Sequence, residues 1–121
     1  MAYDDNNIFA KILRGEIPCK KVFEDEWALA FHDIRPQAPV HVLVIPKGKY
    51  VAMDDFSAKA SPDEIAGFFR AVGEVARILD LPPKGYRILA NQGRDGGQEV
   101  PHFHVHIFGG RPLGRMIAQA G

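Results

Sequence analysis

The residues best suited to chemistry are three histidines at alternate positions, His102, His104 and His106, near one end of the 121-residue chain. Successive side chains of a β-strand point to opposite faces, so this spacing places the three imidazoles on one face and the apolar residues between them on the other. An imidazole changes charge near neutral pH and can serve as a nucleophile, an acid or a base. The pattern therefore predicts a strand with a core face and a reactive face.

A metal site and a solvated surface are the alternatives to this histidine chemistry. A strand rises about 3.3 Å per residue, so His102 and His106 would stand roughly 13 Å apart along it, whereas zinc holds nitrogens about 2.1 Å away. The three histidines cannot share one ion, although two neighbours could do so with a ligand from elsewhere, such as His41. We therefore expect no metal and no other cofactor, with a zinc protein as the alternative.

The bulk composition is that of one domain spanning residues 1–121. The 15 basic and 15 acidic residues cancel, which favours neither a nucleic-acid partner nor a membrane surface. The single cysteine, Cys19, fits a reducing compartment, and we interpret it as incidental to function. No signal-peptide pattern and no run long enough to span a membrane is present. We predict a soluble, cytoplasmic protein in which residues 1–6 are disordered and residues 112–121 form a C-terminal tail.

Apolar periodicity predicts the elements that must position the histidines. A short helix carries Ile8 and Phe9 and closes at Gly15, and a long helix begins at the capping box formed by Ser61 and Glu64. The apolar face of the long helix is broad enough to cover both a sheet and a partner subunit. Strands are expected at 21–24, 27–32, 41–45, 86–90 and 102–108. Five strands joined mostly by short connections, with one long and one short helix, indicate an antiparallel α+β domain.

The segment 91–99 contains three glycines in nine residues and ends just before His102. It can be a long turn between two strands, or a loop whose backbone N–H groups approach an anion. Its position beside three histidines favours a loop that holds phosphate.

These residues together resemble the histidine triad (HIT) family, and in particular its Hint branch, over residues 8–115. The matching motifs are His102-x-His104-x-His106, Ile8-Phe9-x-Lys11-Ile12, Gly15-Glu16-Ile17-Pro18, Ala30-Phe31-His32-Asp33-Ile34, Pro36-Gln37-Ala38-Pro39-x-His41, Gly96-Gly97-Gln98 and Gly109-Gly110-Arg111. The resemblance implies a HIT fold whose homodimer joins two five-stranded sheets into one of ten strands. It also implies binding of the purine nucleotides AMP or GMP, and hydrolysis of the P–N bond in purine nucleoside phosphoramidates, extending to aminoacyl adenylates.

The resemblance also assigns the catalytic residues. His104 would attack phosphorus and form a nucleotidyl-histidine intermediate, with a backbone carbonyl holding its other ring nitrogen in the protonated form. His102 and His106 would hydrogen-bond phosphate oxygens and assist proton transfer, and His41 would join their network.

The nucleoside would be held by residues for which an ordinary structural role is also open. Asp33 would accept the ribose hydroxyls, although it could equally cap a turn. The apolar residues around the base would also be core positions. The proposed binding set is Asp33, Ile34, Asn91, Gly97, Gln98, Glu99, Ile8, Phe9, Ile12 and Phe31, with His32 as a weaker candidate.

Two departures from the family pattern limit what the resemblance implies. Glu99 stands where many Hint proteins carry a serine, and the segment 110–121 lacks a tryptophan. The leaving-group preference is therefore not implied. A dinucleoside polyphosphate hydrolase and a nucleotide- or zinc-binding interaction module with little turnover remain the alternative functions.

Overall fold

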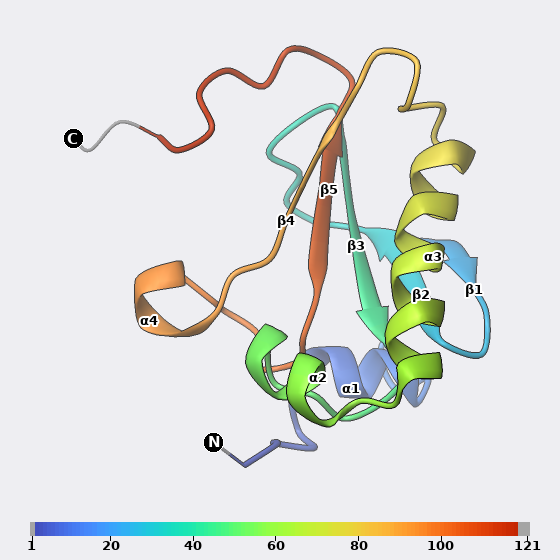
Figure 1. The fold of residues 1–121 in the computed structure, drawn as a ribbon, viewed down its shortest axis with the longest axis vertical. Helices are drawn as coiled ribbons and strands as arrows, with labels where there is room; N and C mark the ends of the chain where they lie inside the picture. Colours follow the sequence, from blue (N-terminus) through green and yellow to red (C-terminus); the bar gives the residue numbers. More distant parts are fainter. Residues whose placement is uncertain (1, 119–121) are drawn as a thin grey trace.

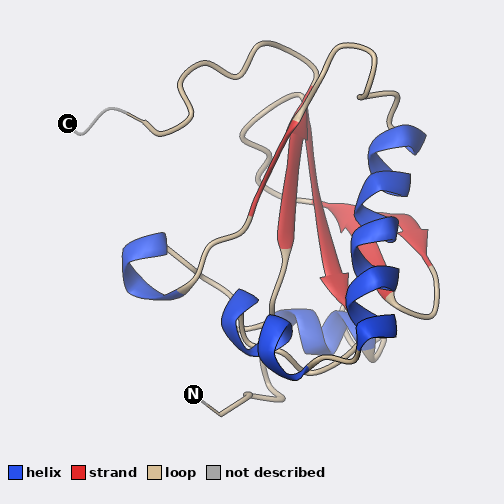
Figure 2. Ribbon diagram, in the orientation of Figure 1, coloured by secondary structure: helices blue, strands red, loops and turns tan. Residues whose placement is uncertain are grey.

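The computed structural model describes residues 2–118 and contains one five-stranded antiparallel sheet with four helices (Figures 1 and 2). The strands are β1 (Lys21–Glu24), β2 (Ala28–His32), β3 (Val40–Pro46), β4 (Arg87–Leu89) and β5 (Val105–Gly109). The helices are α1 (Ile8–Leu13), α2 (Met53–Lys59), α3 (Pro62–Ile78) and α4 (Gly93–Gly96). The strand order is β1-β2-β3-β5-β4, so β3 is central, and the predicted α+β class is confirmed.

The long helix α3 covers one face of this sheet. Ser61 caps it through the N–H of Glu64, and the Glu64 carboxylate accepts from the N–H of Ser61, which is the predicted capping box. The helix buries Phe68 and Val75 against the strands. Phe68 meets the ring of Phe103, with centroids 5.4 Å apart. The intervening apolar residues of the histidine segment therefore face the main core, as their alternation predicts.

The short helix α1 lies against the other face, at the end where β3 finishes. Asn7 caps α1 by accepting from the N–H of Ala10 at 2.9 Å. Phe9 then packs edge-on against Phe31 of β2, with ring centroids 5.5 Å apart. A second, smaller apolar cluster forms here from Phe9, Leu29, Phe31, Leu43 and Ile45.

The last strand is shorter than predicted, because pairing begins at Val105 rather than at His102. Val105 pairs with Val44 of β3, and the same register would bring Phe103 opposite Pro46. Proline has no backbone N–H to donate, so the ladder cannot continue there. His102 and His104 consequently precede the strand, and only His106 lies within it.

Two helices and one terminal segment also differ from expectation. The helices α2 and α4 were not predicted: α2 buries only Phe56, and its Asp55 carboxylate accepts from the N–H groups of Val51 and Ala52, just before the helix. Residues 2–6, for which the sequence predicts disorder, have a defined conformation, with the N–H of Asn7 bonded to the carbonyl of Asp4. Residues 1 and 119–121, which include the end of the predicted tail, lie outside the described residues.

No helix within residues 2–118 is both long and apolar enough to cross a membrane.

Candidate active site

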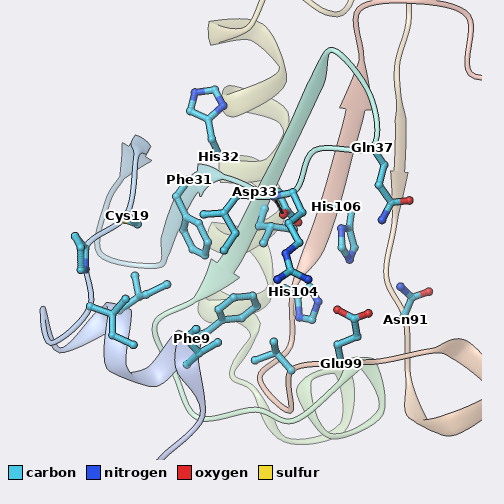
Figure 3. Close-up of a pocket in the computed structure, with 18 of the residues that line it drawn as sticks. Phe9, Cys19, Phe31, His32, Asp33, Gln37, Asn91, Glu99, His104 and His106 are labelled. Atoms are coloured by element: carbon cyan, nitrogen blue, oxygen red, sulfur yellow. Dashed lines mark hydrogen bonds between the residues drawn. The ribbon is translucent and has the colours of Figure 1, made fainter.

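A cavity of about 480 Å³ opens on the α1 side of the sheet and contains the middle and last histidines of the triad (Figure 3). Its walls come from α1, from the end of β2 and the loop that follows, from β5 and from the segment 91–100. The lining residues are Ile8, Phe9, Ile12, Ile17, Pro18, Cys19, Phe31, His32, Asp33, Ile34, Arg35, Gln37, Leu43, Asn91, Gly97, Glu99, Val100, His104 and His106.

His104 presents one unprotonated nitrogen to this cavity. Its Nδ1 lies 2.7 Å from the backbone carbonyl of His102, and a carbonyl can only accept, so Nδ1 carries the proton. The remaining nitrogen, Nε2, then holds a lone pair. Burial lowers the pKa of His104 below its ordinary value, which keeps the ring neutral. The backbone carbonyl expected for this tautomer is thus that of His102.

His106, whose ring centroid lies 5.0 Å from that of His104, also lines the cavity and presents a donor there. The N–H of Gln37 donates to Nδ1 of His41 at 3.1 Å, which places the His41 proton on Nε2. This Nε2–H donates to Nδ1 of His106 at 2.9 Å, so the second nitrogen of His106 carries a proton. Burial, together with the neighbouring His104 and His41, lowers the pKa of His106 to about 4. A backbone amide and two neutral imidazoles therefore fix the direction of this chain of donors.

His41 itself does not line the main cavity. It lies behind Asp33 and borders a second hollow, which it shares with Asp33 and His32. Its side chain is buried, and burial lowers its pKa. His41 thus acts on the cavity through His106.

Asp33 points its carboxylate into the cavity at the end of β2. One oxygen accepts from the N–H of Arg35 at 2.8 Å, which is the turn-capping role considered for it. The other oxygen lies 3.4 Å from His41 Nε2. Asp33 therefore caps its turn and faces the cavity at the same time.

His102 is fully buried and does not line the cavity. Its Nε2 donates to the carbonyl of Pro46 at 2.9 Å, and its Nδ1 lies 2.6 Å from the hydroxyl of Tyr3. Burial lowers its pKa to about 4. The sequence predicts a direct contact between His102 and a phosphate. This placement of His102 does not fit such a contact.

The glycine-containing segment forms the wall opposite α1. Its backbone turns at Gly97, where φ is +75°, a conformation that favours glycine. Asn91, Gly97 and Glu99 line the cavity, but Gln98 does not. The Gln98 amide donates to the carbonyls of Val51 and Val100 at 2.6 and 3.0 Å. Gln98 therefore holds the segment in place. It does not face the cavity, although it was predicted to belong to the binding set.

One group of side chains at this site could also hold a metal ion. Ligand atoms of Asp33, His41 and His106 all lie within 4.8 Å of one another. The metal site considered from the sequence combined His41 with two histidines of the triad. The group in the structure contains His41, Asp33 and one triad histidine, His106. The spacing suits a three-ligand zinc site with an open fourth position.

The apolar residues predicted to surround a base, Ile8, Phe9, Ile12, Phe31 and Ile34, all line the cavity. Ile8 and Ile34 are exposed, so they are not the core positions that were also expected. Sequence reasoning missed Arg35 and Gln37, although both lie in the loop between Asp33 and His41. It also missed Tyr3, whose partner His102 is 99 positions away. Cys19 lies at the cavity edge, where burial raises the pKa of its thiol, and a protonated thiol fits its interpretation as incidental.

Comparisons with known proteins agree with this geometry. The family model for the HIT domain matches residues 14–113. An uncharacterized 13.2 kDa HIT-like protein of Azospirillum brasilense is 69% identical over 117 residues, which cover 97% of this chain and 96% of that one. A purine nucleoside phosphoramidase of Escherichia coli is 41% identical over 117 residues, covering 97% and 98%. A solved structure of a HIT family hydrolase from Clostridium thermocellum superposes with a TM-score of 0.86 at 36% identity, covering 95% and 99%.

Proposed function

The chain belongs to the HIT domain family and is a HIT-family hydrolase, and we propose that it cleaves the P–N bond of purine nucleoside phosphoramidates such as AMP–amine conjugates. The observation that carries the proposal is the hydrogen bond from His104 Nδ1 to the carbonyl of His102 at 2.7 Å. It leaves the Nε2 lone pair of a neutral imidazole in a cavity of nucleotide size, beside an N–H donor. The relative from Escherichia coli, which is named a purine nucleoside phosphoramidase, supports the choice of substrate.

In the proposed first step, His104 Nε2 attacks phosphorus. A bond forms between Nε2 and phosphorus while the bond from phosphorus to the amine nitrogen breaks, and that nitrogen takes up one proton from solvent, giving a nucleotidyl-histidine and a free amine. The water that reacts in the second step returns one proton to solvent. The N–H of His106 would hydrogen-bond a non-bridging oxygen, where charge increases as the bonds change. Because this N–H is oriented through His41 and Gln37 in the free protein, little reorganisation accompanies the step.

In the second step, water cleaves the bond between His104 and phosphorus. One water is consumed over both steps, with its oxygen on the released nucleoside monophosphate and a proton on the departed amine. His104 returns to its starting tautomer because the carbonyl of His102 again holds Nδ1–H. The same path would serve aminoacyl adenylates, with an acyl oxygen as the leaving atom.

The nucleoside would lie across the cavity away from the histidines. The apolar side chains of α1, with Phe31 opposite them, offer a slot for a purine ring. The Asp33 carboxylate lies between this slot and His106, where two ribose hydroxyls could donate to it. Asn91 and Gly97 border the phosphate end.

His102 takes a different role from the one predicted. Since it is buried, we propose that it acts through its backbone carbonyl rather than by touching phosphate. His102→Ala keeps that carbonyl and should slow turnover less than His104→Ala does. Equal losses from the two variants would undermine His104 as the sole nucleophile.

The test is turnover of an AMP–amine phosphoramidate in EDTA by the wild type and by His104→Ala. We expect cleavage by the wild type and a loss on the order of 10⁴-fold in the variant, the scale at which removed nucleophiles act. AMP should still bind the variant, because the apolar slot and Asp33 are intact. Binding without cleavage by the wild type would favour an interaction module, and preferential cleavage of a dinucleoside polyphosphate would favour that hydrolase class.

A zinc protein is the second candidate, favoured by the group of Asp33, His41 and His106. Zinc at this group would displace the proton that His41 donates to His106, so it would compete with the proposed mechanism. Metal analysis of the purified protein decides between the two. One equivalent of tightly held zinc would favour the zinc protein.

We also propose that two copies form a homodimer through β4 and α3. The strand β4 is at the edge of the sheet and exposes Ile88, and α3 exposes Phe69 and Ile78. An edge strand with exposed apolar side chains is suited to pairing with a second copy. Sedimentation equilibrium should give twice the chain mass, and Ile88→Lys should shift it toward the monomer.

A further inference from the structure

The N-terminal arm, residues 2–7, reaches the triad from outside the sheet. The Tyr3 hydroxyl lies 2.6 Å from Nδ1 of His102, and the two rings meet edge-on with centroids 5.6 Å apart. Burial raises the pKa of Tyr3, so its hydroxyl keeps its proton at neutral pH. Neither the family match, which begins at residue 14, nor the proposed mechanism assigns this tyrosine a role.

The partners of His102 fix the direction of both of its hydrogen bonds. The carbonyl of Pro46 can only accept, so Nε2 of His102 carries the proton. Nδ1 therefore holds a lone pair, and the Tyr3 hydroxyl is the donor. His102 is thus anchored at both ring nitrogens while its side chain is fully buried.

This anchoring matters because His102 precedes β5 and lacks a strand ladder to hold it. The ladder between β3 and β5 begins at Val105. The carbonyl of His102 nevertheless has to stay 2.7 Å from Nδ1 of His104 to keep the nucleophile in one tautomer. The N–H of Phe103, in the same peptide group as this carbonyl, donates to the carbonyl of Tyr50 at 2.7 Å. The side-chain bonds from Tyr3 and to Pro46 hold the other side of His102, where strand pairing is absent.

We propose that Tyr3 is a positioning residue: its hydroxyl holds His102, and the carbonyl of His102 in turn holds His104 in its reactive tautomer. This inference rests on the proposed function for its kinetic consequence, but the tautomers themselves can be measured without substrate. Tyr3 would not touch the substrate, since it does not line the cavity.

The rest of the arm is built to hold Tyr3 in place. The N–H and the side-chain amide of Asn7 both donate to the carbonyl of Asp4, at 3.2 and 2.7 Å. Asp5 pairs with Lys49 at 2.8 Å, and its carbonyl accepts from Arg14 at 3.0 Å. Through these residues, which all follow the tyrosine, the arm is therefore tied to both ends of α1 and to the segment after β3.

The test compares Tyr3→Phe with Tyr50→Phe. Tyr3→Phe removes one hydroxyl and keeps the ring that packs on His102. Tyr50→Phe is the matched control, because it removes a hydroxyl that donates to Glu64 at 2.8 Å, on α3 and away from the cavity. Steady-state kinetics on an AMP–amine phosphoramidate and nitrogen-15 NMR of the histidine rings are measured for both variants and the wild type.

We expect Tyr3→Phe to lower kcat about tenfold, the size of one buried hydrogen bond left unmade, with KM within about twofold. The ring signals of His102 should shift, and His104 should lose its single Nδ1-protonated tautomer. Tyr50→Phe should match the wild type in kcat and in both tautomers.

An unchanged His104 tautomer in Tyr3→Phe would overturn the proposal, whether or not kcat falls. An altered tautomer with kcat within about twofold of the wild type would overturn it too. If the wild type cleaves no phosphoramidate, the proposed function fails, and the NMR comparison alone then decides whether Tyr3 positions His104.

Discussion

The two sides of the histidine segment differ in what surrounds them, although they alternate along one stretch of chain. On the α3 side, Phe103, Val105 and Ile107 are buried among aromatic and aliphatic side chains, which stabilise them without directional bonds. On the α1 side, His104 and His106 are also largely enclosed, but each has a ring nitrogen held by a named partner. Burial thus gives stability on one side and neutral, oriented imidazoles on the other.

This difference shows why the cavity can be reactive without weakening the fold. A buried polar group is costly when it has no partner. Within residues 2–118, every buried side-chain nitrogen and oxygen has a hydrogen-bond partner. Because of the partners that they have, His104 keeps a lone pair and His106 keeps an N–H. Substitutions on the two sides should therefore separate stability from activity.

The largest effect on stability should come from Ile107→Ala on the α3 side. Ile107 is fully buried, so the variant should lose about 2–5 kcal/mol of the free energy of unfolding, from lost burial and the cavity left behind. Urea denaturation measures this loss. The folded fraction should retain wild-type KM, and a stability within about 0.5 kcal/mol of the wild type would break the comparison.

The adjacent variant His106→Ala should show the opposite result. We expect kcat to fall on the order of 100-fold, because a donor to phosphate is lost. The free energy of unfolding should change by only about 1 kcal/mol, since His41 Nε2 keeps an acceptor in Asp33. Kinetics and denaturation on the same preparation check both parts, and a stability loss as large as that of Ile107→Ala would contradict them.

Lowering the pH should reduce the free energy of unfolding through the histidines of the α1 side. Burial lowers the pKa values of His102 and His106 to about 4, against 6.5 for an ordinary histidine. Between these values the unfolded chain binds more protons than the folded one, so the free energy of unfolding should fall as the pH drops from 6.5 toward 4. Turnover should decline only toward the lower end of this range, near pH 4, where the imidazoles of the folded protein gain protons.

Denaturation and kinetics across this pH range test that prediction. A wild-type stability that rises as the pH falls through the window would contradict it. His106→Ala is the matched control, because it should show a shallower loss of stability with acid.

The smallest effect should come from a charge away from both sides. Glu24 of β1 pairs with Lys21 and Lys47 at 2.8 and 2.6 Å, and these contacts lower its pKa to about 2. The pairs are exposed, so Glu24→Gln should cost at most about 1 kcal/mol and leave kcat unchanged. Thermal denaturation at low and high salt would show the difference disappear with salt. A change in kcat would mean that the sheet edge is coupled to the cavity.

The parts of the site that are local in sequence were the predictable ones. Alternation assigned the faces of residues 103–107, and the motifs that resemble the HIT family identified Asp33 and His41. The burial of His102 was not predictable, because it depends on Tyr3 and Pro46, which are 99 and 56 positions away. The start of β5 was missed because the reason for it, the lack of an N–H at Pro46, lies on the partner strand.

The central claim is that His104 becomes covalently bound to the nucleotide, and trapping that intermediate tests it most directly. The wild type and His104→Ala would be mixed with an AMP–amine phosphoramidate, quenched in alkali within one turnover, and digested for mass spectrometry. We predict a nucleotidyl group on His104 in the wild type and none in the variant. Turnover by the wild type with no adduct, or with an adduct on a residue other than His104, would contradict the account.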